Sequence, residues 1–141
     1  MAALCITSEE HVFSWGRQGR SGCLGRPDVP SNEHARPGRV KLPGPACAVD
    51  AESGASAAVL AEGLLFMWGS NDYGRLGLEG LKPAAAVSTP HLIELPEPGV
   101  VKKISLGSLY SACIIELSAA DPSGKRAVLC TWGYGGHGRY E

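Results

Sequence analysis

The chain has 141 residues, enough for about one domain, and its 44% hydrophobic and 19% charged residues are typical of a globular protein. Its formal net charge of -1 gives no overall field that would attract nucleic acid or an anionic membrane. Glycine and proline number 19 and 10, an excess that favours many turns and few long helices.

Secretion is not expected, because "MAALCITSEEH" has neither a positive n-region nor a sustained apolar segment. Without a signal peptide, the odd number of cysteines indicates reduced thiols in an intracellular compartment, the cytoplasm or the nucleus. The longest apolar stretch, residues 55–68, is interrupted and too short to span a bilayer, so no membrane insertion is expected. No two cysteines form a Cys-x-x-Cys pair, so the usual spacing of a zinc or thioredoxin site is missing. The five cysteines are Cys5, Cys23, Cys47, Cys113 and Cys130.

The first predicted elements are two strands within residues 4–16, "LCITSEEHVFSWG", where two apolar runs flank a polar turn. After the polar loop 26–36, "VKLP" (40–43) is predicted to be a third strand ended by proline. "ACAV" (46–49) is predicted to be a fourth strand that leads into the following segment.

The same order of elements follows in the rest of the chain. Residues 57–69, "AAVLAEGLLFMWG", predict a hairpin, and its continuous apolar runs suit strands buried on both faces. "IELP" (93–96) and "VVKKISLG" (100–107) predict the next two strands, and residues 112–133 a hairpin with a long polar turn. The Ala-rich segment 46–63 could form a helix when considered alone, but its central glycine and its register with residues 100–117 favour strand.

Three versions of one phrase recur along the chain: "VFSWG" (12–16), "LFMWG" (65–69) and "LCTWG" (129–133). Matched prolines and glycines divide residues 1–141, a single repeat region, into two full units, 1–53 and 54–106, and an incomplete unit, 107–141. Four strands in each unit of about 50 residues predict a β-propeller. We therefore expect an all-β protein, a partial β-propeller with two complete four-stranded blades and part of a third.

The repeated residues have a structural explanation. Each tryptophan is expected to fill the gap between adjacent sheets, and the glycine after it to let the backbone turn. The Gly-x-Leu-Gly that follows is expected to return the chain, with its leucine under the loop. The predicted structural residues are Trp15, Gly16, Gly22, Leu24, Gly25, Gly54, Trp68, Gly69, Gly74, Leu76, Gly77, Gly107, Trp132, Gly133 and Gly138.

"WGSNDYGRLG" (68–77) resembles the repeat signature of the regulator of chromosome condensation family, as do the downstream Pro-x-x-Val/Ile-x-Leu and the glycine opening the next unit. The resemblance implies a β-propeller, which in that family has seven blades. Its founding member is an exchange factor for the small GTPase Ran that docks on chromatin, and many relatives are interaction modules of larger proteins. Two departures are the absence of the histidine that often follows Gly54 and Gly107, and an arginine, Arg75, where glutamine is often found.

About two and a half repeats cannot close a ring, and an open stack leaves uncovered sheet faces and an unpaired strand edge at each end. This predicts a fragment, a truncated gene product or part of a multi-chain assembly. By resemblance, we expect a protein-interaction module that scaffolds or regulates a partner protein, with guanine-nucleotide exchange on a small GTPase as one specific form. The best candidates for partner contact are the loops 26–36 and 121–127, since binding residues concentrate on loops held by a rigid scaffold.

Two further functions are open. The first is chromatin or nucleic-acid binding through the first 42 residues, which carry six basic side chains against four acidic ones: Arg17, Arg20, Arg26, Arg36, Arg39 and Lys41. The second is a nucleotide-cofactor enzyme using "GYGGHG" (133–138), which satisfies Gly-x-Gly-x-x-Gly at Gly133, Gly135 and Gly138. A dinucleotide site also needs a helix and an acid about 20 residues on, whereas the chain ends three residues later.

No enzyme chemistry is predicted from other motifs. His11, His34, His91 and His137 are far apart and follow no metal-binding spacing. "GRSGC" (19–23) and "GASAA" (54–58) lack the closing glycine of a nucleophile elbow. We therefore expect no enzyme, no catalytic or metal-ligating residue and no cofactor.

Overall fold

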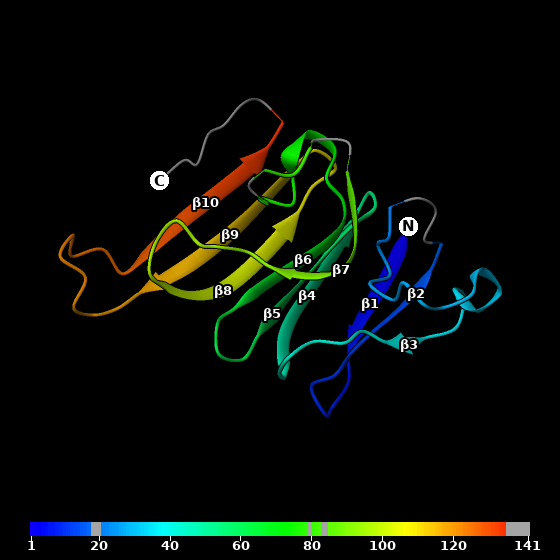
Figure 1. The fold of residues 1–141 in the computed structure, drawn as a ribbon. Coiled ribbons are helices and arrows are strands. Elements are labelled where there is room, and N and C mark those ends of the chain that lie inside the picture. The colour runs from blue at the N-terminus through cyan, green and yellow to red at the C-terminus, as the bar shows by residue number, and fades with distance from the viewer. Residues whose placement is uncertain (18–20, 79, 83–84, 135–141) are drawn as a thin grey trace.

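The computed structural model describes residues 1–17, 21–78, 80–82 and 85–134. Within them, the strands form three antiparallel sheets that lie beside one another (Figure 1). Sheet A has the order β1-β2-β3, sheet B β4-β5-β6-β7 and sheet C β10-β9-β8. The strands are β1 (Ala2–Ile6), β2 (Val12–Gly16), β3 (Gly38–Arg39), β4 (Ala46–Glu52), β5 (Ala55–Leu60), β6 (Leu65–Ser70), β7 (Ala86–Leu92), β8 (Gly99–Leu106), β9 (Tyr110–Leu117) and β10 (Ala127–Gly133), with short 3₁₀ turns η1 (Ser31–Glu33) and η2 (Asp72–Gly74).

The predicted all-β partial propeller is confirmed, but the number of strands in each sheet differs from the prediction. In the described residues, only sheet B has four strands, and sheets A and C have three each. The segments expected to end one unit, β4 and β8, pair instead with the strand that follows them, β5 and β9. The short turns at 53–54 and 107–109 reverse the chain at once, so the nearest antiparallel partner is the next strand. The sheets are thus offset by one strand from the repeat units, whose bounds remain a prediction.

The third strand of each unit lies earlier than predicted. Strand β3 covers residues 38–39 and β7 covers 86–92, whereas strands were expected at 40–43 and 93–96. Only the first residue of each expected strand continues the pairing, since Val40 N–H donates to the Val12 carbonyl and Ile93 N–H to the Leu65 carbonyl, each at 2.9 Å. The Ala-rich segment 46–63 forms β4, β5 and the start of a turn, so the prediction of strand there is confirmed.

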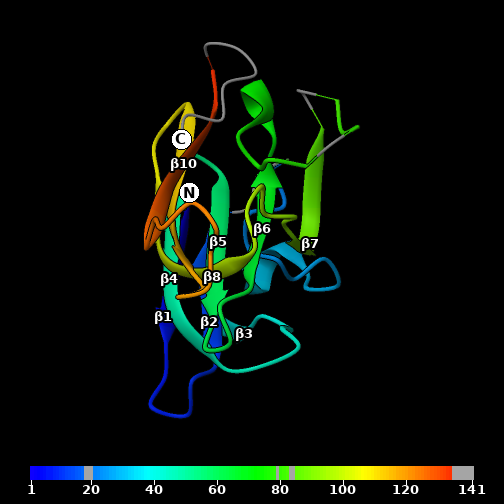
Figure 2. The ribbon, with the colours of Figure 1, turned by 90° about the vertical axis from the view of Figure 1, so that its left-hand side faces the viewer.

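The core lies between the sheets, in two clusters of buried side chains on the two sides of sheet B. All six residues of β5 are buried, which explains its continuous apolar sequence, because sheets A and C cover both of its faces. Strand β9 alternates buried and exposed positions and is covered by sheet B on one face. Figure 2, which views the molecule from the side of sheet C, shows sheets B and A behind it.

The two ends of the sheets carry different loops. At one end, here called the hairpin end, the turns 7–11, 61–64 and 118–126 join the strands of each hairpin. At the opposite end, the Trp-Gly end, each Trp-Gly pair finishes β2, β6 or β10 (Figure 1). The turns between β4 and β5 and between β8 and β9 also lie at the Trp-Gly end, because β4 and β8 run antiparallel to their partners.

Candidate protein-interaction surface

Sheets A and B are joined at the Trp-Gly end by a contact between Trp68 and a backbone carbonyl. Trp68 is fully buried, and its Nε1 donates to the Cys23 carbonyl at 2.9 Å. The Ser56 hydroxyl donates to the same carbonyl at 2.7 Å. Gly25 lies against the indole at φ +65°, and a Cβ there would stand 2.7 Å from Trp68 Nε1. Glycine at this position therefore allows the loop to approach the ring closely.

The same contact recurs between sheets B and C. Trp132 Nε1 and the Ser111 hydroxyl both donate to the Arg75 carbonyl, each at 2.7 Å. Cys23 and Arg75 are both the second residue of a Gly-x-Leu-Gly segment, so the repeated sequence creates a repeated acceptor. We call this arrangement the tryptophan–carbonyl contact. The serine donors, Ser56 and Ser111, were not singled out from the sequence. Each is the second residue of its strand, β5 or β9, but this shared position gives no sign of the acceptor, which lies in another unit.

The structure places the other predicted repeat residues in the loops and turns of the Trp-Gly end. Leu24 and Leu76 are fully buried beneath their loops. Gly69 has φ +100°, and a Cβ there would lie 2.2 Å from the Gly54 carbonyl oxygen, so a larger residue would separate β6 from the preceding turn. Trp15 is half-buried at the end of β2. A positive φ also occurs at Gly16, Gly22, Gly54, Gly74, Gly77 and Gly133. Gly107 lies in its turn without one, and Gly138 lies outside the described residues.

The loop after β6 is organised by the amide of Asn71, which is fully buried. Its Oδ1 accepts from Leu76 N–H at 3.1 Å, and its Nδ2 donates to the Lys82 carbonyl at 3.2 Å. Because both polar atoms of the amide are paired, the side chain replaces backbone hydrogen bonds that the irregular loop cannot make itself. This residue appears in the Trp-Gly-x-Asn signature, which was the sequence signal for its role.

Arg75 holds three backbone segments together at the same end. Its side chain is 2% exposed, and its Nε and Nη1 donate to the carbonyls of Ser70, at 3.2 Å, and Ser108, at 2.8 Å. Nη2 donates to the Ser53 carbonyl. Burial lowers the pKa of the guanidinium, and the carboxylates of Asp72 and Glu52 oppose that shift. The cation thus connects the turns at 53–54 and 107–109 with the end of β6.

Two exposed tyrosines lie at the same end of the sheets, next to the hydrogen bonds of Asn71 and Arg75. Tyr73 and Tyr134 are 52% and 53% exposed, and their rings meet edge to face with centroids 4.9 Å apart. Tyr73 has φ +60°, an uncommon backbone conformation for a residue other than glycine. Tyrosine supplies a large contact area with a polar tip and is enriched in protein interfaces. We therefore regard the Trp-Gly end around these two rings as the candidate interaction surface, which the sequence analysis did not identify.

The two loops selected from the sequence lie at opposite ends of the sheets, so they do not form one contact surface. Loop 26–36 connects β2 to β3 and starts from the Trp-Gly end of sheet A. Arg26 fixes this loop, because its guanidinium donates to the Ser14 hydroxyl at 3.1 Å, the Ser14 carbonyl at 3.0 Å and the Arg36 carbonyl at 3.1 Å. Burial lowers the pKa of the Arg26 guanidinium, and the Glu33 carboxylate opposes this shift. This arginine is therefore engaged within the protein.

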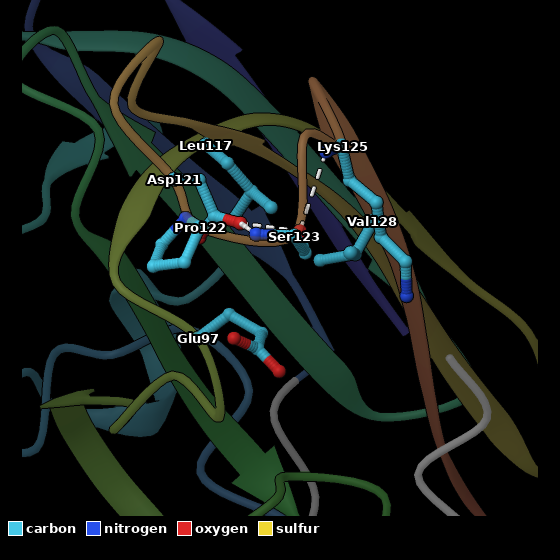
Figure 3. A pocket seen from close by; sticks show the side chains of 7 residues that line it. All are labelled: Glu97, Leu117, Asp121, Pro122, Ser123, Lys125 and Val128. Atoms are coloured by element: carbon cyan, nitrogen blue, oxygen red, sulfur yellow. Dashed lines mark hydrogen bonds between the residues drawn. The ribbon is translucent and has the colours of Figure 1, made fainter.

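Loop 121–127 lies at the hairpin end and borders an open hollow (Figure 3). The Asp121 carboxylate accepts hydrogen bonds from the hydroxyl and from the backbone N–H of Ser123, and these lower its pKa. The carboxylate thus stabilises its own turn, and the hollow shows no convergent set of polar groups that would fix a small molecule. Its lining residues are Glu97, Leu117, Asp121, Pro122, Ser123, Lys125 and Val128.

The described histidines occupy separate places. His11 lies 3.7 Å from Glu9, His34 Nε2 contacts the Val29 carbonyl at 3.0 Å, and His91 Nδ1 contacts the Thr89 carbonyl at 2.8 Å. Outside the described part of the chain lie His137 and, beyond Gly133, the glycines of "GYGGHG". Among the residues that the structure describes, no three His, Cys, Asp or Glu side chains could together hold a metal ion. In the same part of the chain, no helix has the length and apolar composition needed to cross a membrane.

Cys113 and Cys130 face each other across β9 and β10, and both are buried. Burial raises the pKa of the Cys113 thiol to about 12, and the neighbouring Cys130 adds to the shift. At pH 8 the Cys113 side chain is therefore in its protonated, unreactive thiol form. We expect iodoacetamide to label exposed Cys47 early and Cys113 only after denaturant is added, as followed by peptide mass spectrometry. Equal labelling rates for the two cysteines in the native protein would contradict this assignment.

Comparisons with known proteins agree with the geometry. Residues 62–114 match the family model "Regulator of chromosome condensation (RCC1) repeat". Over 96% of its length the chain is 31% identical to E3 ubiquitin-protein ligase HERC2 of Homo sapiens, of which it spans 3%. Human WBSCR16 has a similar fold, with a TM-score of 0.74 and 23% identity, and the match covers 95% of this chain and 31% of that one.

A second solved structure with a similar fold is that of Prp20p from Saccharomyces cerevisiae, described together with its binding to Gsp1p and histones. Its TM-score is 0.71 at 24% identity, and the match covers 94% of this chain and 28% of that one. At such identities the likeness shows the fold alone. This chain spans less than one third of either solved chain.

Proposed function

We propose that this chain, which carries an RCC1 repeat at residues 62–114, is a protein-interaction module that scaffolds or regulates a partner protein. The observation that carries the proposal is the exposed Tyr73–Tyr134 pair at the Trp-Gly end. Both rings are more than half exposed although they already contact each other, so a partner surface can cover them without any rearrangement of the core.

The base beneath the tyrosines is rigid, which favours binding. Asn71 and Arg75 fix the loop that carries Tyr73, and Trp132, next to β10's final glycine, is held by the Arg75 carbonyl. A partner therefore meets side chains whose backbone is already ordered, so little conformational entropy is lost on binding. A large aromatic area on an ordered base is the usual composition of an interface hot spot.

Guanine-nucleotide exchange on a small GTPase is the specific form of regulation that we favour. Exchange requires that the protein bind the GTPase and displace its nucleotide, so it needs no nucleophile, metal or general base on this chain. The family resemblance supports this form, and the similarly folded Prp20p is described as binding Gsp1p. An intracellular location, in the cytoplasm or the nucleus, belongs to the same proposal and can be tested by imaging a fluorescently tagged chain.

A nucleotide-release assay tests the proposal. Small GTPases loaded with fluorescent GDP would be mixed with the 141-residue chain, and binding would be measured in parallel by biolayer interferometry. We expect one GTPase to bind and to release GDP faster. The double variant Tyr73→Ala/Tyr134→Ala should weaken that binding about tenfold or more, because truncating interface hot spots typically costs over 1 kcal/mol each. Leu92→Ala, at an exposed leucine on β7, is the control and should bind as the parent chain does.

The outcomes separate the two levels of the proposal. Binding without faster GDP release would remove the exchange activity and leave the interaction module. Equal binding by the tyrosine variant and the parent chain would remove the Trp-Gly end as the interface. Absence of binding to every GTPase tested would overturn a small GTPase as the partner.

Chromatin or nucleic-acid binding is the second candidate function. The observation in its favour is a basic group at β3 and the residues on either side of it, where Arg36, Arg39 and Lys41 are exposed. The net charge of -1 and the engagement of Arg26 within the protein argue against a strong site. Binding to a DNA duplex that falls steeply as salt rises would support this function, and an affinity independent of salt would oppose it.

A further inference from the structure

The three sheets pack through two different faces, and the chain uses the same pairing twice. The first face, here called the indole face, carries Phe66 and Trp68 on β6, and it is buried against sheet A. The second, here called the leucine face, carries Leu65 and Val59 on the other side of sheet B, and it is buried against sheet C. Successive residues of a strand point to opposite faces, which is why adjacent residues of β6 belong to different interfaces.

Among the described residues, sheet C presents a leucine face whose side chains are exposed. Its register pairs Leu129 with Ile114, as sheet B pairs Leu65 with Val59, four residues from the Trp-Gly end in each case. Leu65 and Val59 are fully buried, whereas Leu129 and Ile114 are 54% and 37% exposed. Figure 2 views the molecule from this side, with β10 and β8 in front. The same face also includes Tyr110, which is 51% exposed.

Sheet A presents an indole face that is only partly covered. Phe13 and Trp15 precede Gly16 as Phe66 and Trp68 precede Gly69, so they occupy the equivalent positions on β2. The residues of β2 that alternate with them, such as Val12, point toward sheet B. Phe13 and Trp15 are only half-buried, whereas Phe66 and Trp68 are 9% and 0% exposed. The outward faces of sheets A and C are thus the two halves of the interface that already forms twice within the molecule.

We propose that copies of this chain associate head to tail, with the indole face of sheet A in one copy packed on the leucine face of sheet C in the next. The partner is a second copy of this chain for two reasons. Within one copy, the leucine face of sheet B already packs against the tryptophan-bearing side of sheet C. Sheet A of a second copy would offer Phe13 and Trp15 to sheet C, in the positions that Phe66 and Trp68 hold on sheet B. The contact is heterologous, so each copy uses a different surface from its neighbour. Repetition of the internal rotation either closes a ring or extends a chain of blades.

Sedimentation velocity of the full 141-residue chain over a range of concentrations tests the proposal. We expect the parent chain to form species larger than a dimer. Leu129→Glu blocks the leucine face and Phe13→Glu blocks the indole face, so each variant alone should sediment as a monomer. Leu92→Glu alters an exposed leucine on β7 of sheet B, outside the two sheets that are proposed to meet, and should associate as the parent does. Circular dichroism on heating establishes that each variant is folded, and Ala3→Glu, opposite Trp15 on β1, replaces Phe13→Glu if that variant does not fold.

A mixing experiment distinguishes this arrangement from others. The Leu129→Glu and Phe13→Glu variants each retain one intact and complementary face, so an equimolar mixture should form a one-to-one dimer and nothing larger. A parent chain that stays monomeric at all concentrations would overturn the proposal. Association that survives both substitutions, as pairing through strand edges would, would also overturn it. So would self-association of one variant alone, as a symmetric interface built from its intact face would give, or a mixture that stays monomeric.

Discussion

Replacing Trp68 with alanine is expected to lower the free energy of unfolding by about 3–5 kcal/mol, among the largest effects of any single substitution in this chain. The indole is fully buried between sheets A and B, and its removal leaves a cavity beside Phe66, Leu60 and Val12. The Cys23 carbonyl also loses one of its two donors. Urea denaturation followed by circular dichroism measures the change.

Two matched variants separate the causes of that loss. Trp68→Phe keeps an aromatic ring but removes Nε1–H, and we expect a smaller loss of about 1–2 kcal/mol because the Ser56 hydroxyl still donates to the carbonyl. Trp15→Ala alters the equivalent but half-buried ring of sheet A and should cost less than Trp68→Ala. A loss for Trp68→Ala no larger than that for Trp15→Ala would contradict the greater contribution assigned to the fully buried indole.

Replacing Arg75 with methionine is expected to lower the free energy of unfolding by about 3 kcal/mol, since buried carbonyls that lose their donors retain the full cost of desolvation. Methionine fills much of the same space, so the effect reports the hydrogen bonds to Ser53, Ser70 and Ser108. Arg75→Gln restores part of the donor capacity and should fall between methionine and the parent chain.

Arg39→Met is the control for this prediction, because Arg39 is exposed and its replacement should change stability by no more than about 0.5 kcal/mol. Both variants would be compared with the parent chain by urea denaturation at pH 7. If Arg75→Met were as mild as Arg39→Met, the buried guanidinium would not join the turns of sheets B and C, and the rigidity of the surface under Tyr73 would need another origin.

The fold class followed from the sequence because its signals are local and repeated. The Trp-Gly phrase recurs at the end of β2, β6 and β10, so three copies of one hairpin could be recognised without any knowledge of their packing. The continuous apolar run of β5 and the alternating pattern of β9 also reported how many faces of each strand are covered. Gly54 favoured a turn between β4 and β5 over a helix, as observed.

The tertiary structure alone decided which strands share a sheet and what the loops contact. Pairing of β4 with β5 depends on how sharply the chain turns at 53–54, whereas the repeat period is the same for either assignment. The donors and acceptors of the tryptophan–carbonyl contacts are separated by 45 and 57 residues. A pattern in one segment carries no information about such distant partners, which become neighbours only when the sheets pack. For the same reason Tyr73 and Tyr134, which belong to different units, were found as one surface only in three dimensions.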